Sequence, residues 1–284
     1  MGKFKGIIIV SDYDGTFYNG NKESRVKNIA EVERFKNNGG LFTFATGRDR
    51  HSLMAIEPEY ENIVNAPIIM ANGSRLYDSE KNQYLFDYTL NLSLFSEFYE
   101  IIFEKYPDMG IRFSCENGLV IPVLNKIIEN DLTDMFTGNI SVREMPVKDL
   151  IKSGEKVYKC VMIHDPEKLD FVRETGENFN KNNNHEFCFT RTYSRGLETV
   201  NINASKGASA LRLKQYLNTR DNLEYKLFTI GDYDNDLDMI KAADYGAAPE
   251  NALESVKKSA KIHTVGCSDG AVADLIRIIE KEYL

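Results

Sequence analysis

Short apolar runs that end abruptly in polar turns recur along this chain. Ile7–Val10 is the first of them, and its branched side chains predict a strand that is buried on both faces of a parallel sheet. The runs Leu41–Ala45, Ile68–Ala71 and Leu227–Ile230 end in the same manner. Four strand ends therefore carry polar residues.

Segments with helical spacing separate these runs. Apolar residues in Ser24–Asn38 recur near the helical period, and the glycines that follow favour a helix end. A second helix is predicted from Lys206 to Leu217, with Ser205 as its N-cap. Strands that alternate with helices predict a doubly wound α/β fold, that is, a Rossmann-like parallel sheet. Ligands of such sheets bind at the carboxyl ends of the strands, so we expect the polar turns to meet.

The middle of the chain has a different pattern, which predicts an inserted α+β cap domain at residues 83–196. The α/β core then consists of residues 1–82 and 197–284. The strands expected in the insertion are Tyr84–Tyr88, Ile111–Ser114, Leu119–Val123, Val157–Ile163 and Phe187–Tyr193. The helices expected there are Leu92–Glu104, Leu124–Phe136 and Pro166–Phe179.

Composition narrows the possible partners and location. The chain has 284 residues and a formal net charge of −8, so it has no overall basic field to attract nucleic acid. It has no apolar run of the roughly 18 residues that span a bilayer, and its four cysteines form no C-x-x-C pair. We expect a cytoplasmic protein with reduced thiols that binds neither membrane nor nucleic acid. We also expect a monomer or a weak homodimer.

Two carboxylates follow the first predicted strand. Asp12 and Asp14 lie two residues apart, where like charges resist ionisation unless a cation compensates them. Mg²⁺ prefers a few carboxylates together with phosphate and water, and Asp232, at the end of another strand, is the natural partner of Asp12. Asp12 is then a sufficient nucleophile toward phosphorus, and Asp14 can protonate the leaving group and later activate water.

The other strand ends carry groups that suit a phosphate. Thr46 and Gly47 offer a hydroxyl and an unobstructed backbone N–H, and Lys206 lies in the first turn of its helix, where an anion is favoured. Each feature has an ordinary alternative: an Asp-rich turn, a common Thr-Gly turn, a surface lysine, or acids that stabilise a helix start. The spacing Gly231-Asp232-x-x-Asn235-Asp236 behind a strand is more specific. Together these features favour metal-assisted phosphoryl transfer.

In order and context, these motifs resemble those of the haloacid-dehalogenase superfamily of phosphatases, and within it the Cof-type branch of sugar-phosphatase-like proteins with a type IIB cap. The first motif is Asp12-Tyr13-Asp14-Gly15-Thr16, the second Thr46-Gly47-Arg48, the third Ser205-Lys206-Gly207 and the fourth Gly231-Asp232-Tyr233-Asp234-Asn235-Asp236. Asn72-Gly73-Ser74 and Pro249-Glu250-Asn251-Ala252 resemble further segments of this branch.

The resemblance implies a role for each matching residue. Asp12 is the nucleophile; Asp14 is the acid/base, and its backbone carbonyl also binds Mg²⁺. The resemblance further implies that Asp232 ligates Mg²⁺, that Asp236 orients ligands of the metal, and that Thr46, Gly47, Lys206 and Asn235 hold the phosphoryl group. A cap would close over the site, with Arg191, Tyr193 and Arg195 as candidates for contact with the leaving group.

The predicted function is thus the Mg²⁺-dependent hydrolysis of small phosphate monoesters, such as sugar phosphates, through an aspartyl-phosphate. Two alternatives stay open. A phosphomutase would use the same core and respond to a bisphosphate activator. A non-catalytic regulator would bind metal and a phospho-ligand as a signal, although it would need no general acid such as Asp14.

Overall fold

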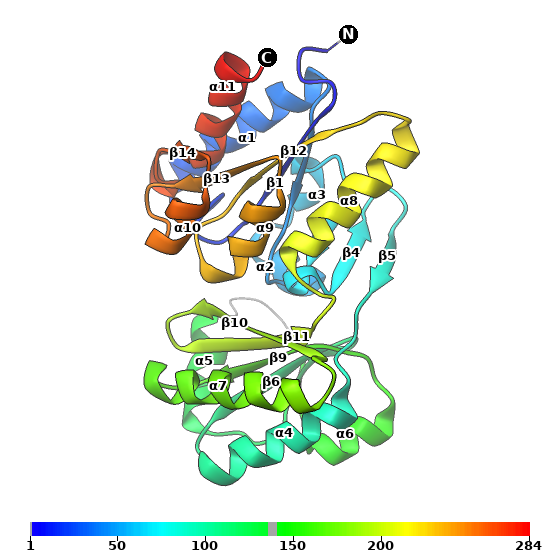
Figure 1. The fold of residues 1–284 in the computed structure, drawn as a ribbon, viewed down its shortest axis with the longest axis vertical. Coiled ribbons are helices and arrows are strands. Elements are labelled where there is room, and N and C mark those ends of the chain that lie inside the picture. The colour runs from blue at the N-terminus through cyan, green and yellow to red at the C-terminus, as the bar shows by residue number, and fades with distance from the viewer. Residues whose placement is uncertain (1, 136–140) are drawn as a thin grey trace. The chain divides into compact units, whose positions relative to one another are not determined.

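The computed structural model describes residues 2–135 and 141–284, which form two compact units (Figure 1). The first unit comprises Met1–Gly47, Glu59–Phe86 and Ser205–Leu284, and the second comprises Arg48–Pro58 and Asp87–Ala204. Within the described residues, no helix is both long and apolar enough to cross a membrane.

The first unit is built on a five-stranded parallel sheet with the order β14-β13-β12-β1-β2. Its strands are β1 (Ile7–Ser11), β2 (Leu41–Phe44), β12 (Lys226–Ile230), β13 (Tyr245–Pro249) and β14 (Ile262–Thr264). The central strand β1 is buried along its whole length, which is why it reads as a continuous apolar run. Ile9 pairs with Phe42 on one side and with Phe228 on the other.

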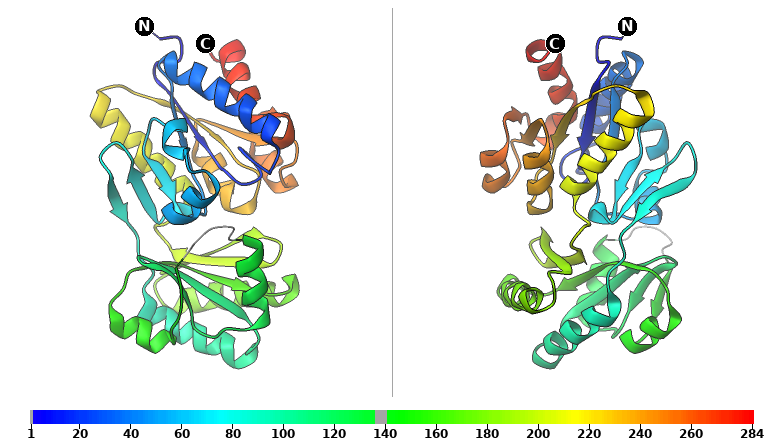
Figure 2. Two further views of the ribbon diagram at one scale, coloured as in Figure 1. Left: turned by 180° about the vertical axis from the view of Figure 1, so that it is seen from behind. Right: turned by 45° about the vertical axis from the view of Figure 1, so that its right-hand side comes forward.

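Helices lie on both faces of this sheet, as a doubly wound fold requires (Figures 1 and 2). One face carries α1 (Lys22–Asn37) and α11 (Ala271–Glu282); the other carries α8 (Lys206–Asp221), α9 (Leu237–Ala242) and α10 (Glu254–Ser259). The short helix α3 spans Tyr60–Ile63. The predicted α/β core is therefore confirmed.

Side-chain caps set the starts of the two longest helices of this unit. The side chain of Asn21 accepts hydrogen bonds from the N–H groups at the start of α1. Ser205 does the same for α8, as predicted, by accepting from the N–H of Ala208 at 3.1 Å. This N-cap by Ser205 fixes Lys206 at the first position of α8.

A small three-stranded sheet completes the first unit. It consists of β3 (Ile68–Met70), β4 (Arg75–Asp78) and β5 (Gln83–Asp87), and a bridge between Ala45 and Ile69 joins it to the end of β2. After β3 the chain makes a 3₁₀ turn, η1 (Ala71–Gly73), with positive φ at all three residues.

The second unit has a six-stranded sheet with the order β10-β11-β9-β6-β7-β8, in which only the β7–β8 pair is parallel among the described pairs. The strands are β6 (Gly110–Cys115), β7 (Gly118–Ile121), β8 (Val142–Glu144), β9 (Val157–Ile163), β10 (Phe187–Tyr193) and β11 (Gly196–Asn201). The helices are α2 (Arg50–Ile56), α4 (Leu92–Lys105), α5 (Lys126–Met135), α6 (Val147–Ser153) and α7 (Pro166–Asn182).

The core of the second unit is aromatic. Phe95 contacts the rings of Phe98, Phe113 and Phe187 edge-on, with centroids 5.7 to 5.9 Å apart. An α+β insertion is confirmed. The helix predicted over Leu124–Phe136 starts later, at Lys126, and Phe136 lies outside the described residues.

Strand pairing extends past both of the predicted insertion limits. β5 begins at Gln83 and pairs within the first unit, whereas β11 begins at Gly196 and pairs with β9 and β10 of the second. Apart from Arg48–Pro58, the second unit begins after Phe86, and the chain returns to the first unit at Ser205.

Candidate active site

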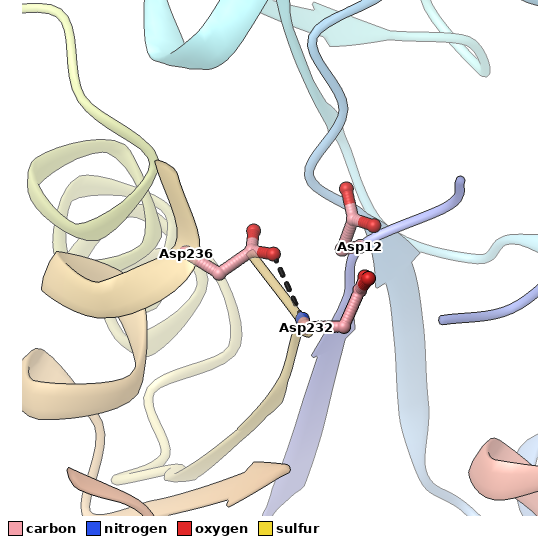
Figure 3. Close-up of side chains that lie close together, drawn as sticks. All are labelled: Asp12, Asp232 and Asp236. Carbon is pink, nitrogen blue, oxygen red and sulfur yellow. Dashed lines mark hydrogen bonds between the residues drawn. The ribbon is translucent and has the colours of Figure 1, made fainter. Parts of the chain in front are cut away.

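Three carboxylates converge where β1 and β12 end. Asp12 directly follows β1 and its N–H donates to the carbonyl of Ile230, the last residue of β12, at 2.9 Å. Asp232 stands two residues beyond Ile230. Oxygens of Asp12, Asp232 and Asp236 lie within 4.8 Å of one another (Figure 3). All three belong to the first unit, so this cluster is built entirely by the α/β core.

Lys206 joins two of these carboxylates. Its Nζ donates to Asp12 Oδ1 at 2.5 Å and to Asp236 Oδ1 at 2.7 Å, and its side chain is fully buried. Burial opposes a charged lysine, but the two aspartates outweigh that effect and raise the pKa of Lys206 above its ordinary value. Lys206 therefore stays an ammonium, and it can hold one oxygen of Asp12 in place.

Asp232 is oriented by the residues that follow Asp12 along the chain. Thr16 Oγ1 donates to Asp232 Oδ1 at 2.6 Å. Gly15 packs against the same carboxylate: a Cβ at this position would lie 2.6 Å from Asp232 Oδ2, and its φ of +84° also favours glycine. Gly15 and Thr16, which follow Asp14, thus shape the place that Asp232 occupies.

Asp236 organises its own turn. Its Oδ2 accepts hydrogen bonds from the backbone N–H groups of Asp232 at 3.0 Å and Tyr233 at 3.1 Å, and Figure 3 shows the first of these. Gly231 allows this close approach, because a Cβ there would lie 2.4 Å from Asp236 Cγ. Both oxygens of Asp236 therefore accept hydrogen bonds within the protein, and Lys206 donates to Oδ1 of Asp12.

The charges of this cluster do not balance. Burial first, and then the neighbouring Asp236, raises the pKa of Asp232 to about 6. The pKa of Asp12 is also raised well above its ordinary value, mainly by burial, since Lys206 offsets only part of this effect. Three carboxylates face one ammonium, so a divalent cation with oxygen ligands would remove the repulsion. The donor set fits a hard metal ion.

Asp14 lies beside this cluster on an exposed part of the loop. It forms an isolated bridge with Tyr18, and its charge contributes to the raised pKa of Asp232. It is thus within electrostatic range of the carboxylates but remains open to solvent.

The predicted phosphate-binding residues occupy the neighbouring strand ends. Thr46 is fully buried and follows β2, and its N–H donates to the carbonyl of Ile69 in β3. Asn235 Nδ2 donates to Asn72 Oδ1 at 3.1 Å, and the amide of Asn72 faces Gly47, where a Cβ would lie 3.3 Å from Asn72 Oδ1. Asn72 therefore connects the ends of β2, β3 and β12.

Sequence reasoning left several contributors without a role. Thr16 and Asn72 belong to sequence motifs, and Asn251 belongs to the segment Pro249-Glu250-Asn251-Ala252, but the sequence predicts no role for any of them. In the structure, each of them bonds to a residue more than 100 positions away. The three residues expected to contact the leaving group bond to aspartates of the second unit instead. Arg191 donates to Asp170, Tyr193 to Asp131 and Arg195 to Asp165.

Comparisons with known proteins agree with this geometry. The family model described as haloacid dehalogenase-like hydrolase matches residues 9–276. A solved haloacid dehalogenase-like hydrolase from Bacteroides thetaiotaomicron superposes with a TM-score of 0.75 at 25% identity, over 97% of this chain and 100% of that one.

Two curated relatives are named as phosphatases. The 5-amino-6-(5-phospho-D-ribitylamino)uracil phosphatase YwtE of Bacillus subtilis is 24% identical over 94% of this chain and 96% of its own. The pyridoxal phosphate phosphatase YbhA of Escherichia coli is 25% identical over 90% of this chain and 92% of its own. The family match confirms the predicted hydrolase class. The chain belongs to the haloacid dehalogenase-like hydrolases, in their Cof-type branch.

Proposed function

We propose that this enzyme is a Mg²⁺-dependent phosphatase that hydrolyses small phosphate monoesters through a phosphoryl group carried on Asp12. The observation that supports the proposal most strongly is the convergence of the Asp12, Asp232 and Asp236 carboxylates, two of which, Asp12 and Asp236, bond to the buried ammonium of Lys206. Such a cluster has too much negative charge for a purely structural role, and it lies at the strand ends where ligands of this fold bind.

The metal would be held by the side chains of Asp12 and Asp232 and by the backbone carbonyl of Asp14. Asp236, whose two oxygens already accept hydrogen bonds, would orient the ligands through Lys206 and its own turn. When bound, Mg²⁺ supplies positive charge that neutralises the phosphoryl oxygens and the crowded carboxylates.

The reaction then divides into two displacements by residues of this chain. In the first, a carboxylate oxygen of Asp12 attacks phosphorus and forms a P–O bond, the ester P–O bond breaks, and Asp14 gives a proton to the leaving oxygen. In the second, Asp14 takes a proton from water, the water oxygen attacks phosphorus, and the bond to Asp12 breaks. Inorganic phosphate is released and both aspartates are restored.

The remaining residues would bind and orient the phosphoryl group. Lys206 holds Asp12 and offers charge to a phosphoryl oxygen, while Thr46, Gly47 and Asn235 contribute a hydroxyl, a backbone N–H and an amide. Because Asn72 connects Gly47 with Asn235, it is the residue that keeps these donors together.

The proposal extends to the organisation and setting of the enzyme. The second unit would act as the cap that selects the leaving group, and the first unit would be the catalytic core. The names of the relatives suggest phosphorylated metabolites such as ribitylaminouracil phosphate and pyridoxal phosphate, beside sugar phosphates. We infer a cytoplasmic enzyme, monomeric or weakly dimeric.

The first experiment is phosphate release from p-nitrophenyl phosphate with Mg²⁺ and with EDTA. Activity should require the metal, should be lost in Asp12→Asn and should fall, without vanishing, in Asp14→Asn. A screen of phosphorylated metabolites then ranks natural substrates by kcat/KM. Activity that persists in Asp12→Asn would reject the proposed nucleophile, and isomerised phosphosugar without released phosphate would indicate a mutase.

A further inference from the structure

Side chains from outside the loop that carries Asp14 bond to it, and Asn251 is one of them. The Asp14 loop, as we call Asp12–Asn21, connects β1 to α1. Asn251 Nδ2 donates to the carbonyl of Gly15, the residue after Asp14, at 2.9 Å. Asn251 lies 236 positions away in sequence, in the turn between β13 and α10.

The amide of Asn251 is bonded at both ends. While Nδ2 donates to Gly15, its Oδ1 accepts a hydrogen bond from the N–H of Cys267 at 2.8 Å. A backbone N–H can only donate and a carbonyl can only accept, so this pair of partners fixes the orientation of the amide. Asn251 thus forms a bridge between the Asp14 loop and the turn at Cys267.

The segment around Asn251 is also tied to Asp232. The N–H of Leu253 donates to the carbonyl of Asp232 at 2.9 Å, and the N–H of Ala252 closes a turn onto Pro249. The four residues from Glu250 to Leu253 therefore contact both acid-bearing loops. A shift of this segment would change the position of Asp14 relative to Asp232.

Empty space lies next to this bridge. A cavity of about 320 Å³ is lined by Gly15, Asn251, Cys267 and Asp269, among other residues. The Asp14 loop therefore borders open space on this side, next to the bond from Asn251. Internal turns, such as the N–H of Gly15 donating to Tyr18, and contacts of Asn19 and Asn21 with Ser268 hold the rest of the loop.

We infer that Asn251 is a positioning residue: it holds the Asp14 loop so that the carboxyl group of Asp14 can reach the leaving oxygen. The inference rests on the proposed function, because it assigns a support to the proposed general acid. It differs from a purely structural role in one measurable respect. A badly placed acid matters most when the leaving group is a poor one, and least when the leaving group departs without a proton.

The test compares a series of substituted phenyl phosphates, from p-nitrophenyl to unsubstituted phenyl phosphate, at saturating Mg²⁺. Asn251→Asp keeps an acceptor for Cys267 but places a carboxylate oxygen against the Gly15 carbonyl, and Asn251→Ala removes both bonds. In both variants kcat/KM should fall about tenfold or more for phenyl phosphate and less than about threefold for p-nitrophenyl phosphate. The loss for phenyl phosphate is then a part of what general acid catalysis contributes in full. Asp14→Asn should also lower kcat/KM more for phenyl phosphate than for p-nitrophenyl phosphate. The double variant Asp14→Asn/Asn251→Asp should depend on the leaving group almost as Asp14→Asn does.

Asn38→Asp is the matched control. Asn38 Nδ2 also donates to a backbone carbonyl, that of Arg34 at 2.8 Å, at the far end of α1. This variant should keep the wild-type dependence on the leaving group. Thermal unfolding of every variant verifies that it is folded.

The results separate the inference from the proposed function. A loss that is equal across the series, or no loss at all, in folded Asn251 variants would overturn the inference while leaving the phosphatase in place. A wild-type enzyme without Mg²⁺-dependent phosphate release would overturn the proposed function itself, and with it the inference.

Discussion

Both units bury charged side chains beside a β-sheet, but they compensate these charges differently. In the second unit, Arg112 Nε donates to Asp131 at 2.7 Å, and Lys159 Nζ donates to Glu198 at 2.8 Å. Each cation has its own carboxylate there, and Tyr193 adds a further hydrogen bond to Asp131 at 2.8 Å. These two pairs are neutral overall, and we interpret them as part of the packing of the sheet.

The first unit brings three carboxylates together, and the buried ammonium of Lys206 bonds to Asp12 and Asp236 among them. Two of them, Asp12 and Asp232, have raised pKa values as a consequence of burial. Natural proteins retain such costly arrangements where a ligand relieves them. The difference between the units shows that an excess of buried charge, rather than buried charge alone, marks the candidate site.

The largest expected effect comes from Asp12→Asn. Loss of the nucleophile should lower kcat for p-nitrophenyl phosphate by roughly 10⁴-fold or more. The metal-free variant should unfold at a similar or higher urea concentration than the wild type, within about 1 kcal/mol, because one of the repelling charges is gone. A large loss of stability would contradict the idea of charge excess.

The same substitution in the second unit should act in the opposite direction on stability. Asp131→Asn leaves the buried guanidinium of Arg112 without its counter-charge and should destabilise the protein by about 3–5 kcal/mol in urea unfolding. A guanidinium keeps its proton at neutral pH, so Arg112 cannot escape the cost of an unpaired buried charge by becoming neutral. An Asp131→Asn variant as stable as the wild type would remove the contrast between the units.

Mg²⁺ should stabilise the enzyme, and more strongly above pH 6 than below it. At a hundredfold excess over Kd the gain is about 2.7 kcal/mol. The folded-state pKa of Asp232, about 6, is higher than its ordinary value of 3.8, so this group favours the folded metal-free protein at low pH. That contribution is lost as pH rises through about 6, where the ionised carboxylate becomes free to bind the metal.

Thermal unfolding at pH 5 and pH 8, with and without Mg²⁺, measures this effect. The rise in Tm on adding Mg²⁺ should be clearly larger at pH 8. An equal rise at both values, or a larger one at pH 5, would mean that Asp232 does not bind the ion.

The smallest effect expected is that of Gly15→Ala, with Gly20→Ala as its control. Both glycines have positive φ, +84° and +94°, so both substitutions should cost about 1–2 kcal/mol of backbone strain. Only at Gly15 would the new Cβ collide with Asp232, since nothing lies within 4 Å of a Cβ at Gly20. Calorimetric titration should therefore show weaker Mg²⁺ binding in Gly15→Ala alone; equal binding in both variants would contradict the described contact.

Much of the fold was predictable because its central strands are continuous apolar runs. β9 and β10 coincide with the predicted Val157–Ile163 and Phe187–Tyr193, and α1 starts within two residues of its predicted start. β13 was not predicted, because Tyr-Gly-Ala-Ala-Pro has few large side chains and gains its strand structure by pairing between β12 and β14.

The sheet that β11 joins was also beyond prediction. The sequence predicts that the core resumes at residue 197, yet Glu198 is buried against Lys159 of β9 in the second unit. This ion pair depends on a partner 39 positions away, and local propensity carries no information about it.

Part of the candidate site could likewise be predicted from the sequence, and part could not. That the polar ends of β1, β2 and β12 would meet follows from parallel topology, which places all carboxyl ends at one edge. The contacts of Thr16 with Asp232, Asn235 with Asn72 and Asn251 with Gly15 do not follow from it, because they depend on the conformations of separate loops.

The most direct test of the account is to locate the phosphoryl group during turnover. The enzyme is mixed with p-nitrophenyl phosphate and Mg²⁺, quenched in acid, reduced with borohydride, and its peptides are analysed by mass spectrometry. Reduction of an aspartyl-phosphate yields homoserine, which should be found at position 12 in the wild type. Homoserine at another position, or turnover by an enzyme in which Asp12 never carries phosphate, would contradict the account.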